Sequence, residues 1–378
     1  MDSALTPSDQ SHKRLVDSFY QTLPGDLRRY LEGAQVVKDS FDLPVGLTPR
    51  ELVWALNKAK LYRYFPSQPL TRPGYPTPLL LVYALINKPY IFDLRPGRSF
   101  IEFMANQGFD LYLLDWGTPG LEDRSIRFDD YASDYLPRAV RKMLRISGAT
   151  EFSMLGYCIG ATLATLYAAL YPQAPLRNLI LLTAPLDFSK REDSLFGLWL
   201  DERFVDVDKM VEALGNIPPG VIEFGAKLLK PVENFVGAYT HVLDNLDDPD
   251  AIENWQAMHK WIHDGVPLAG ETFRQWVKEY IRGNELIRGT HVVKGQRVNL
   301  ANIHAALLNI AAKYDHLVPL SQSTSIMDLV SSPDKRMEII PAGHVGLMGG
   351  RNAKYKLWPL LAEWLAVRSA QNIPASSE

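Results

Sequence analysis

Cysteine is almost absent from this chain of 378 residues, because Cys158 is the only one. A single thiol cannot form an internal disulfide, so the fold does not require an oxidising compartment. Long hydrophobic runs are also missing. The longest, at about 79–86, is far too short to span a bilayer, and the polar N-terminus lacks the apolar core of a signal peptide. We therefore expect a cytoplasmic protein with no transmembrane segment.

Excess charge and ligand-binding motifs are lacking as well. The formal net charge of -3 gives no general attraction to nucleic acid, and neither a P-loop nor a Gly-x-Gly-x-x-Gly fingerprint is present. His259 and His263 stand four residues apart, but no glutamate follows the first histidine as a zinc motif of this spacing requires. A solvated helix face is the favoured interpretation of this pair. We expect no nucleic-acid partner, no metal and no cofactor.

The chain does contain a regular alternation of apolar strands and helices. Strands are predicted at 78–84, 109–115, 152–155 and 176–183, and helices at 99–107, 131–147 and 159–170. The alternation stops near Pro185 and resumes with strands at 305–312 and 336–340 and helices at 321–330 and 355–368. Buried strands that alternate with helices indicate a parallel sheet covered on both faces.

This pattern predicts the domain organisation. Residues 1–50 are expected to form peripheral N-terminal helices, and residues 51–187 and 301–370 an α/β core. Residues 188–300 lack the alternation and are rich in tryptophan and phenylalanine, which predicts a largely helical cap inserted between two strands, over the carboxyl edge of the sheet. Residues 371–378 are small and polar, which is typical of a disordered tail.

Cys158 lies at the centre of Gly-Tyr-Cys-Ile-Gly, residues 156–160, between a predicted strand and a predicted helix. This arrangement has the shape of the Gly-x-Ser-x-Gly nucleophile elbow, with sulfur in place of the serine oxygen. Asp315 and His344 follow two later strands. Carboxyl ends of parallel strands meet at one edge of a sheet, and the order nucleophile, acid, histidine is that of α/β-hydrolases.

Each of these three residues has a chemical role in acyl transfer. A thiol at neutral pH is mostly protonated and needs a base, which His344 can supply. A carboxylate such as Asp315 would orient the imidazole and stabilise its cation. The dipole of the helix that begins at Ile159 would stabilise the thiolate of Cys158.

Two backbone amides are expected to hold the oxyanion. The N–H of Ile159 follows the nucleophile directly and is placed to be the first donor. The second is expected from the loop after the strand at 78–84, from Leu85 or Ile86. Gly156 and Gly160 suit the elbow, because side chains there would collide with the neighbouring strand or helix.

Each residue of the candidate site also has a structural interpretation. A lone cysteine in an apolar context is usually an inert core residue, Asp315 is equally placed to cap the following helix, and Gly-His-Val-Gly at 343–346 is also a plausible simple turn. His316 either lines the site or packs beside it. The three triad residues together, at strand ends and in order, favour the catalytic interpretation.

Longer segments resemble the catalytic subunit of polyhydroxyalkanoate synthases. The matching segments are 81–90, which looks like the family's strand and oxyanion loop, 114–119 with Asp129-Asp-Tyr131, and the cap segments 246–250 and 269–275. The resemblance covers about 52–365, and the length is that of the short two-subunit class III, with class IV as a close relative. Tyr83 and Asn87 in the first segment are possible site-lining residues. Ala161 departs from the family, which usually has a second glycine there.

This resemblance implies a function. The expected reaction is polymerisation of (R)-3-hydroxyacyl groups from coenzyme A thioesters through an acyl-Cys158, with coenzyme A as part of the substrate rather than a cofactor. Short substrates such as 3-hydroxybutyryl-CoA, a homodimer and a second non-catalytic subunit, PhaE-type or PhaR-type if class IV, are implied, at the surface of cytoplasmic polyester granules. The alternatives are a cysteine-based thioesterase or dienelactone-hydrolase-like enzyme, and a non-catalytic granule scaffold.

Overall fold

The computed structural model describes residues 20, 22–71, 74–190 and 193–369, so the predicted tail lies outside the described residues. The chain divides into two compact units. One contains residues 1–43 and 230–260, and the other contains residues 44–229 and 261–378. Each unit has its own internal contacts and is described separately. No helix of the described ranges is long and apolar enough to cross a membrane.

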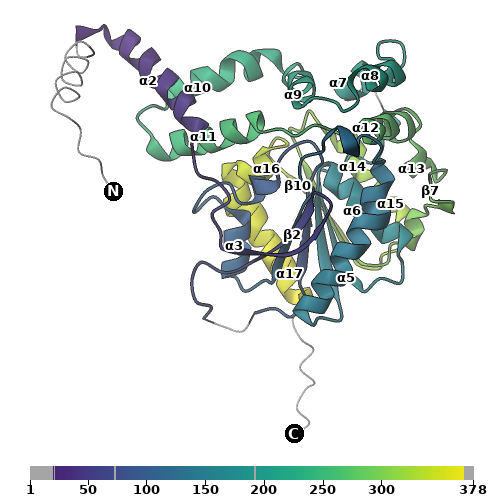
Figure 1. Cartoon of the computed structure of the whole chain (residues 1–378). Coiled ribbons are helices and arrows are strands. Elements are labelled where there is room, and N and C mark those ends of the chain that lie inside the picture. The colour runs from purple at the N-terminus through teal and green to yellow at the C-terminus, as the bar shows by residue number, and fades with distance from the viewer. Residues whose placement is uncertain (1–19, 21, 72–73, 191–192, 370–378) are drawn as a thin grey trace. The chain divides into compact units, whose positions relative to one another are not determined.

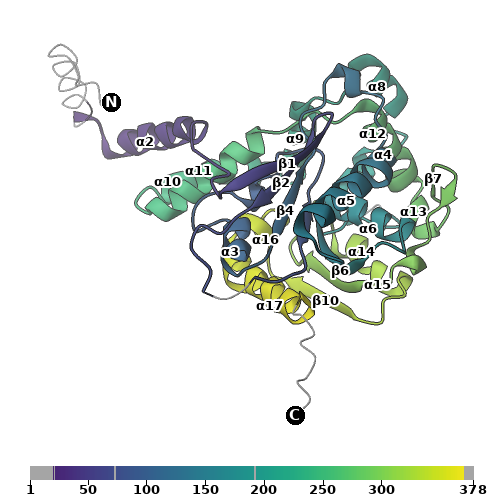
Figure 2. The same cartoon turned by 60° about the horizontal axis from the view of Figure 1, so that its bottom comes forward.

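The larger unit is built on a sheet of eight strands in the order β1-β2-β4-β3-β5-β6-β9-β10 (Figures 1 and 2). All neighbours from β4 to β10 in this order run parallel, whereas β2 is antiparallel to both β1 and β4. The strands are β1 (Arg50–Leu56), β2 (Ala59–Tyr64), β3 (Leu79–Val82), β4 (Leu111–Asp115), β5 (Phe152–Tyr157), β6 (Leu176–Leu182), β9 (Ala306–Ala312) and β10 (Lys335–Ile340).

The central strands are the continuous apolar runs that the sequence predicted. All four residues of β3 and all six of β5 are buried, which is the pattern of a parallel strand covered on both faces. The edge hairpin formed by β1 and β2 was not predicted. Its residues mix charged and apolar side chains, since no residue of β1 is fully buried and β2 is buried only in part. Asn57 makes the turn between the strands with a φ of 53°.

Helices cover both faces of the sheet (Figures 1 and 2). Helices α3 (Phe100–Asn106) and α17 (Trp358–Ser369) contact each other on one face. Helices α5 (Leu136–Ser147) and α6 (Ile159–Leu170) lie on the other face and supply much of the buried core cluster. The remaining helices of the core are α4 (Phe128–Asp130), α14 (Leu320–Thr324), α15 (Ile326–Leu329) and α16 (Gly346–Gly349).

The segment between β6 and β9 contains helices and one small hairpin. Phe273 and Trp276 from this segment belong to the buried core cluster of the larger unit, so this part is anchored on the core. The predicted cap boundaries, 188–300, stay a prediction, since residues 230–260 group with the smaller unit. The elements of the larger unit here are α7 (Leu195–Trp199), α8 (Val207–Leu214), α9 (Pro219–Lys227), α12 (Gly270–Gln275), α13 (Glu285–Arg288), β7 (Val292–Val293) and β8 (Gln296–Arg297).

The smaller unit packs α2 (Gly25–Ser40) against α10 (Ala238–Asp244) and α11 (Pro249–His263). Arg29 donates to the carbonyl of Leu243 at 2.6 Å. His259 of α11 is buried, with Nδ1 2.8 Å from the hydroxyl of Ser40 and its ring stacked on Trp255. The predicted solvated face is therefore wrong for His259, because α2 covers it.

Candidate active site

Cys158 lies on a sharp turn between β5 and α6, as predicted for a nucleophile elbow. Its φ of 57° and ψ of −130° are a conformation that residues with a side chain rarely adopt. The turn is held on both sides, because the N–H of Cys158 donates to Leu182 of the neighbouring strand at 3.0 Å and its carbonyl accepts from Ala161 at 2.8 Å. The thiol is half-buried.

The two glycines of the elbow are required by close approach of other backbone. A Cβ on Gly156 would lie 2.4 Å from the Cα of Ala161, and a Cβ on Gly160 would lie 2.3 Å from the carbonyl oxygen of Val82. Both distances are far below real contacts, so the predicted collisions are confirmed. Ala161 itself is fully buried and belongs to the core cluster.

Asp315 and His344 come together from the loops after β9 and β10. The Nδ1 of His344 lies 2.7 Å from Oδ2 of Asp315. The other carboxylate oxygen accepts hydrogen bonds from the backbone N–H groups of Leu317 at 2.9 Å and Val318 at 2.8 Å. Asp315 therefore orders its own loop and orients the histidine at once. It does not cap the following helix, because the residue at the N-cap of α14 is Pro319.

The histidine is held in an electrostatic environment that favours its cation. Burial lowers the pKa of His344, but the negative charges of Asp315 and of Cys158, and hydrogen bonds with both, raise that pKa well above its usual value. Because Nδ1 faces Asp315, Nε2 is left for the sulfur of Cys158. This is the arrangement of a nucleophile, a base and a carboxylate that orients the base.

The loop after β3 begins beside the elbow, where the sequence placed the second oxyanion donor. Val82, the last residue of β3, is paired with Gly156 of β5. The loop is fixed at two points, since Trp116 Nε1 donates to Tyr83 at 2.9 Å and the N–H of Val266 donates to Ile86 at 3.0 Å. Leu85 lies between these two points and is buried.

The first N–H groups of a helix have no partner within the helix, and Ile159 is the first residue of α6. Its amide therefore stands at the start of the helix, directly after Cys158. The amides of Ile159 and of Leu85 or Ile86 belong to two backbone segments that meet at the elbow. Their assignment as oxyanion donors remains a prediction.

The three predicted site-lining residues differ from one another in burial. Tyr83 is buried, with its ring 5.4 Å from that of Tyr157, and the charge of Cys158 contributes to raising the pKa of its phenol. Asn87 is half-buried and forms a bridge with Gly265. His316 is exposed.

A cavity of about 460 Å³ opens beside the predicted oxyanion loop. Leu85, Asn87 and three lysines are among its lining residues. Two of these lysines already have carboxylate partners: Lys58 pairs with Glu122 and Asp123, and Lys88 with Asp264 at 2.9 Å. The cavity therefore does not present a net positive charge, and we assign no phosphate group to it.

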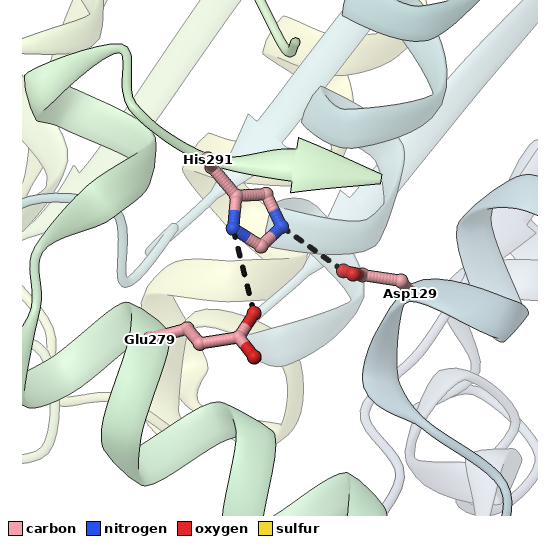
Figure 3. A group of neighbouring side chains, drawn as sticks. All are labelled: Asp129, Glu279 and His291. Carbon is pink, nitrogen blue, oxygen red and sulfur yellow. Dashed lines mark hydrogen bonds and ion pairs between the residues drawn. The ribbon is translucent and has the colours of Figure 1, made fainter. Parts of the chain in front are cut away.

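A second group of acids and a histidine comprises Asp129 and His291, which are buried, and Glu279, which is half-buried (Figure 3). The Nε2 of His291 is 3.1 Å from Asp129, and its Nδ1 is 3.7 Å from Glu279. The amide of Gln275 donates to both of these carboxylates, at 2.5 Å and 2.8 Å, and the phenol of Tyr280 donates to Asp129 at 2.7 Å. Protein donors already occupy the space between the acids, so we assign no metal to this group.

One contact at the site was missed by the sequence analysis. Tyr157, the residue before the nucleophile, donates its hydroxyl to the backbone carbonyl of His344 at 2.8 Å. No motif could reveal this bond, because the two residues are 187 positions apart. The apolar strand around Tyr157 predicted only a buried aromatic residue.

Comparisons with known proteins agree with this geometry. Residues 77–217 match the family model of the alpha/beta hydrolase fold. A soluble variant of monoglyceride lipase from Saccharomyces cerevisiae superposes with a TM-score of 0.56 at 12% identity, covering 87% of this chain and 98% of that one. These findings and the strand order confirm the predicted α/β-hydrolase fold.

Similarity in sequence is more specific. Residues 15–104 match the model described as "Poly-beta-hydroxybutyrate polymerase (PhaC) N-terminus". The poly(3-hydroxyalkanoate) polymerase subunit PhaC of Haloferax mediterranei is 37% identical over 87% of this chain and 66% of that protein. The subunit of the same name from Allochromatium vinosum is 36% identical over 93% of this chain and 98% of that protein. The chain therefore belongs to the family of poly(3-hydroxyalkanoate) polymerase PhaC subunits.

Proposed function

We propose that this protein is a poly(3-hydroxyalkanoate) polymerase that transfers (R)-3-hydroxyacyl groups from coenzyme A thioesters to a growing polyester through an acyl-Cys158. The observation that carries the proposal is the assembly of Cys158, His344 and Asp315 at one edge of the sheet in a member of this family. The names of the relatives support the polymer product, and the thiol on the elbow supports a covalent thioester route.

The acylation half-reaction follows from the contacts of the triad. His344 takes the proton of Cys158, and the sulfur attacks the carbonyl carbon of the acyl-CoA. The negative charge on the carbonyl oxygen is held by the N–H of Ile159 and a second amide, from Leu85 or Ile86. The carbon–sulfur bond to coenzyme A then breaks, the departing sulfur receives the proton from His344, and acyl-Cys158 remains.

In chain extension, the thioester on Cys158 becomes the group that is attacked. A 3-hydroxyl group attacks the carbonyl carbon of acyl-Cys158, an ester bond forms, and the bond to sulfur breaks. His344 moves the hydroxyl proton to the departing sulfur. Both oxygens of Asp315 are already engaged, one with His344 and one with two backbone amides. This supports a role for Asp315 through His344 rather than by direct contact with the hydroxyl.

The finer features of the proposal rest on family membership. We propose short substrates such as 3-hydroxybutyryl-CoA, a homodimer, and a second non-catalytic subunit of the class III or class IV kind, at the surface of polyester granules. None of these features depends on a contact described above. The substrate and the partner subunit are tested by the product formed with and without that subunit.

The test is an assay with 3-hydroxybutyryl-CoA, with and without the partner subunit, of both coenzyme A release and the acyl product. Insoluble polyester is the expected product. Soluble 3-hydroxybutyrate would instead indicate a cysteine hydrolase, and no release of coenzyme A would indicate a scaffold. Cys158→Ala is expected to abolish release, and full release by this variant would contradict any mechanism that uses this thiol.

A further inference from the structure

Three loops must keep a fixed spacing for the triad to work, and hydrogen bonds join two of these loops to each other and the third to the sheet. The Asp315 and His344 loops are joined by the side-chain bond and by the N–H of Tyr314, which donates to the carbonyl of Ala342 at 3.0 Å. The elbow is joined to β6 through Cys158. A direct link between the elbow and the histidine loop is made by Tyr157.

Tyr157 contacts the histidine loop in two ways. Its hydroxyl donates to the backbone carbonyl of His344 at 2.8 Å. Its ring stacks on the imidazole, with the centroids 5.5 Å apart and the planes 24° apart. The side chain is 1% exposed, so water does not compete for either contact.

The phenol is also fixed as a donor. Burial raises the pKa of Tyr157 well above its usual value, and the charges of Cys158 and Asp315 raise it further. The group is therefore a protonated donor at neutral pH. The carbonyl of His344 also accepts a longer bond from Leu347, at 3.4 Å, within its own loop.

We propose that Tyr157 is a positioning residue that sets the distance between His344 and Cys158. Its hydroxyl bonds the backbone of His344 rather than a reacting atom. Tyr157 directly precedes the nucleophile in the chain and is also hydrogen-bonded to the backbone of the base. It therefore couples the positions of the two residues. The inference rests on the proposed roles of Cys158 and His344.

The test compares Tyr157→Phe with Tyr167→Phe. The first removes the hydroxyl and keeps the ring. The second removes the hydroxyl of another buried tyrosine, on α6, whose ring contacts Phe152 and Tyr171 rather than the triad. The readout is the rate at which iodoacetamide alkylates the single cysteine across a range of pH, because this rate reports the thiolate without any assumption about the substrate.

Loss of one hydrogen bond to the base is expected to lower the alkylation rate of Tyr157→Phe at pH 7 by about 3- to 10-fold. The inflection of its pH profile should move, because His344 would be coupled less closely to Cys158. Turnover should fall by a similar factor with KM unchanged. Tyr167→Phe should keep the alkylation rate and pH profile of the unmodified protein.

A second variant at position 157 keeps the test decisive if Tyr157→Phe folds poorly. Incorporation of 4-aminophenylalanine at position 157 retains the ring and a donor at the same position, and is expected to restore at least half of the alkylation rate. An alkylation profile of Tyr157→Phe equal to that of the unmodified protein would overturn the proposal. So would a loss in the 4-amino variant as large as in Tyr157→Phe. Neither result would change the product that the unmodified protein forms in the polymerase assay. The proposal for Tyr157 can therefore be wrong while the proposed function stands.

Discussion

The two buried acid–histidine groups of the larger unit look alike and differ in what their histidines face. His344 has Asp315 on one nitrogen and Cys158 on the other. His291 has Asp129 near Nε2, and Glu279 and Glu285 near Nδ1 at 3.7 Å and 3.6 Å. Only the first histidine can pass a proton to a nucleophile.

The comparison shows that burial and a raised pKa do not by themselves identify a catalytic residue. Burial lowers the pKa of both histidines, and the surrounding carboxylates raise both above the usual value. His291 and Tyr280 bond each other and both bond Asp129 of α4, so this group joins α4 to the segment around Tyr280. A catalytic histidine is distinguished from a structural one by what its second ring nitrogen faces, a nucleophile or further carboxylates. The pKa alone does not distinguish them.

The largest expected effect on turnover comes from replacing Asp315, with the same replacement at Asp129 as the comparison. Asp315→Asn should lower polymerase turnover by about 10²- to 10⁴-fold, because the imidazole loses its orientation and its counter-charge. Asp129→Asn should keep turnover within about 3-fold of the unmodified protein where it is folded, while lowering its melting temperature. Equal losses of turnover in the two variants would remove the distinction between the groups.

The pKa of His344 should respond to the same substitution. It is raised in the folded protein, so the imidazolium persists at pH values where an ordinary histidine, with a pKa of about 6.5, is mostly neutral. Asp315→Asn removes the largest cause that raises it, and the pKa should fall. NMR titration of labelled histidine measures this directly, and Asp129→Asn is the matched control that should leave the His344 signal unchanged.

His291 is expected to affect stability rather than turnover. His291→Gln should lower the free energy of unfolding by about 1–3 kcal/mol at pH 6. Because the folded pKa of His291 is raised, its contribution is fully present below about pH 6.5 and is lost as the pH rises through the folded value. Urea unfolding at pH 6 and at pH 8.5 checks this. A difference between variant and unmodified protein that grows at the higher pH would contradict it.

The smallest expected effect concerns Ala161, which directly follows the second glycine of the elbow. Ala161 is buried in the first turn of α6 and its methyl belongs to the core cluster. Ala161→Gly should lower the free energy of unfolding by about 1 kcal/mol, the usual cost of glycine in a helix, and change turnover by less than about 2-fold. A large gain in turnover would show that the methyl group strains the elbow.

Most of the fold was predictable because central strands bury both faces. Their continuous apolar runs, such as 79–82 and 152–157, leave a clear signal. No residue of the edge strand β1 is fully buried, and β2 beside it is buried only in part, so their signal was weak. The burial of His259 was equally hidden, since it depends on α2, more than 200 residues earlier in the chain.

The candidate site was predictable for the same kind of reason. Cys158, Asp315 and His344 each follow a strand whose end could be located in the sequence, and parallel strands bring their ends to one edge. Contacts between side chain and distant backbone, such as Tyr157 with His344, depend on the exact spacing of loops. Local sequence carries no information about that spacing.

The central claim is that Cys158 carries the growing acyl chain, and mass spectrometry of the acyl-enzyme tests it most directly. The protein is mixed with 3-hydroxybutyryl-CoA, quenched with acid within the first turnovers, digested and analysed. The account predicts 3-hydroxybutyryl groups on the peptide that contains Cys158, and none on any peptide of Cys158→Ala. Polymer formation with acyl groups attached to another residue, or to none, would contradict it.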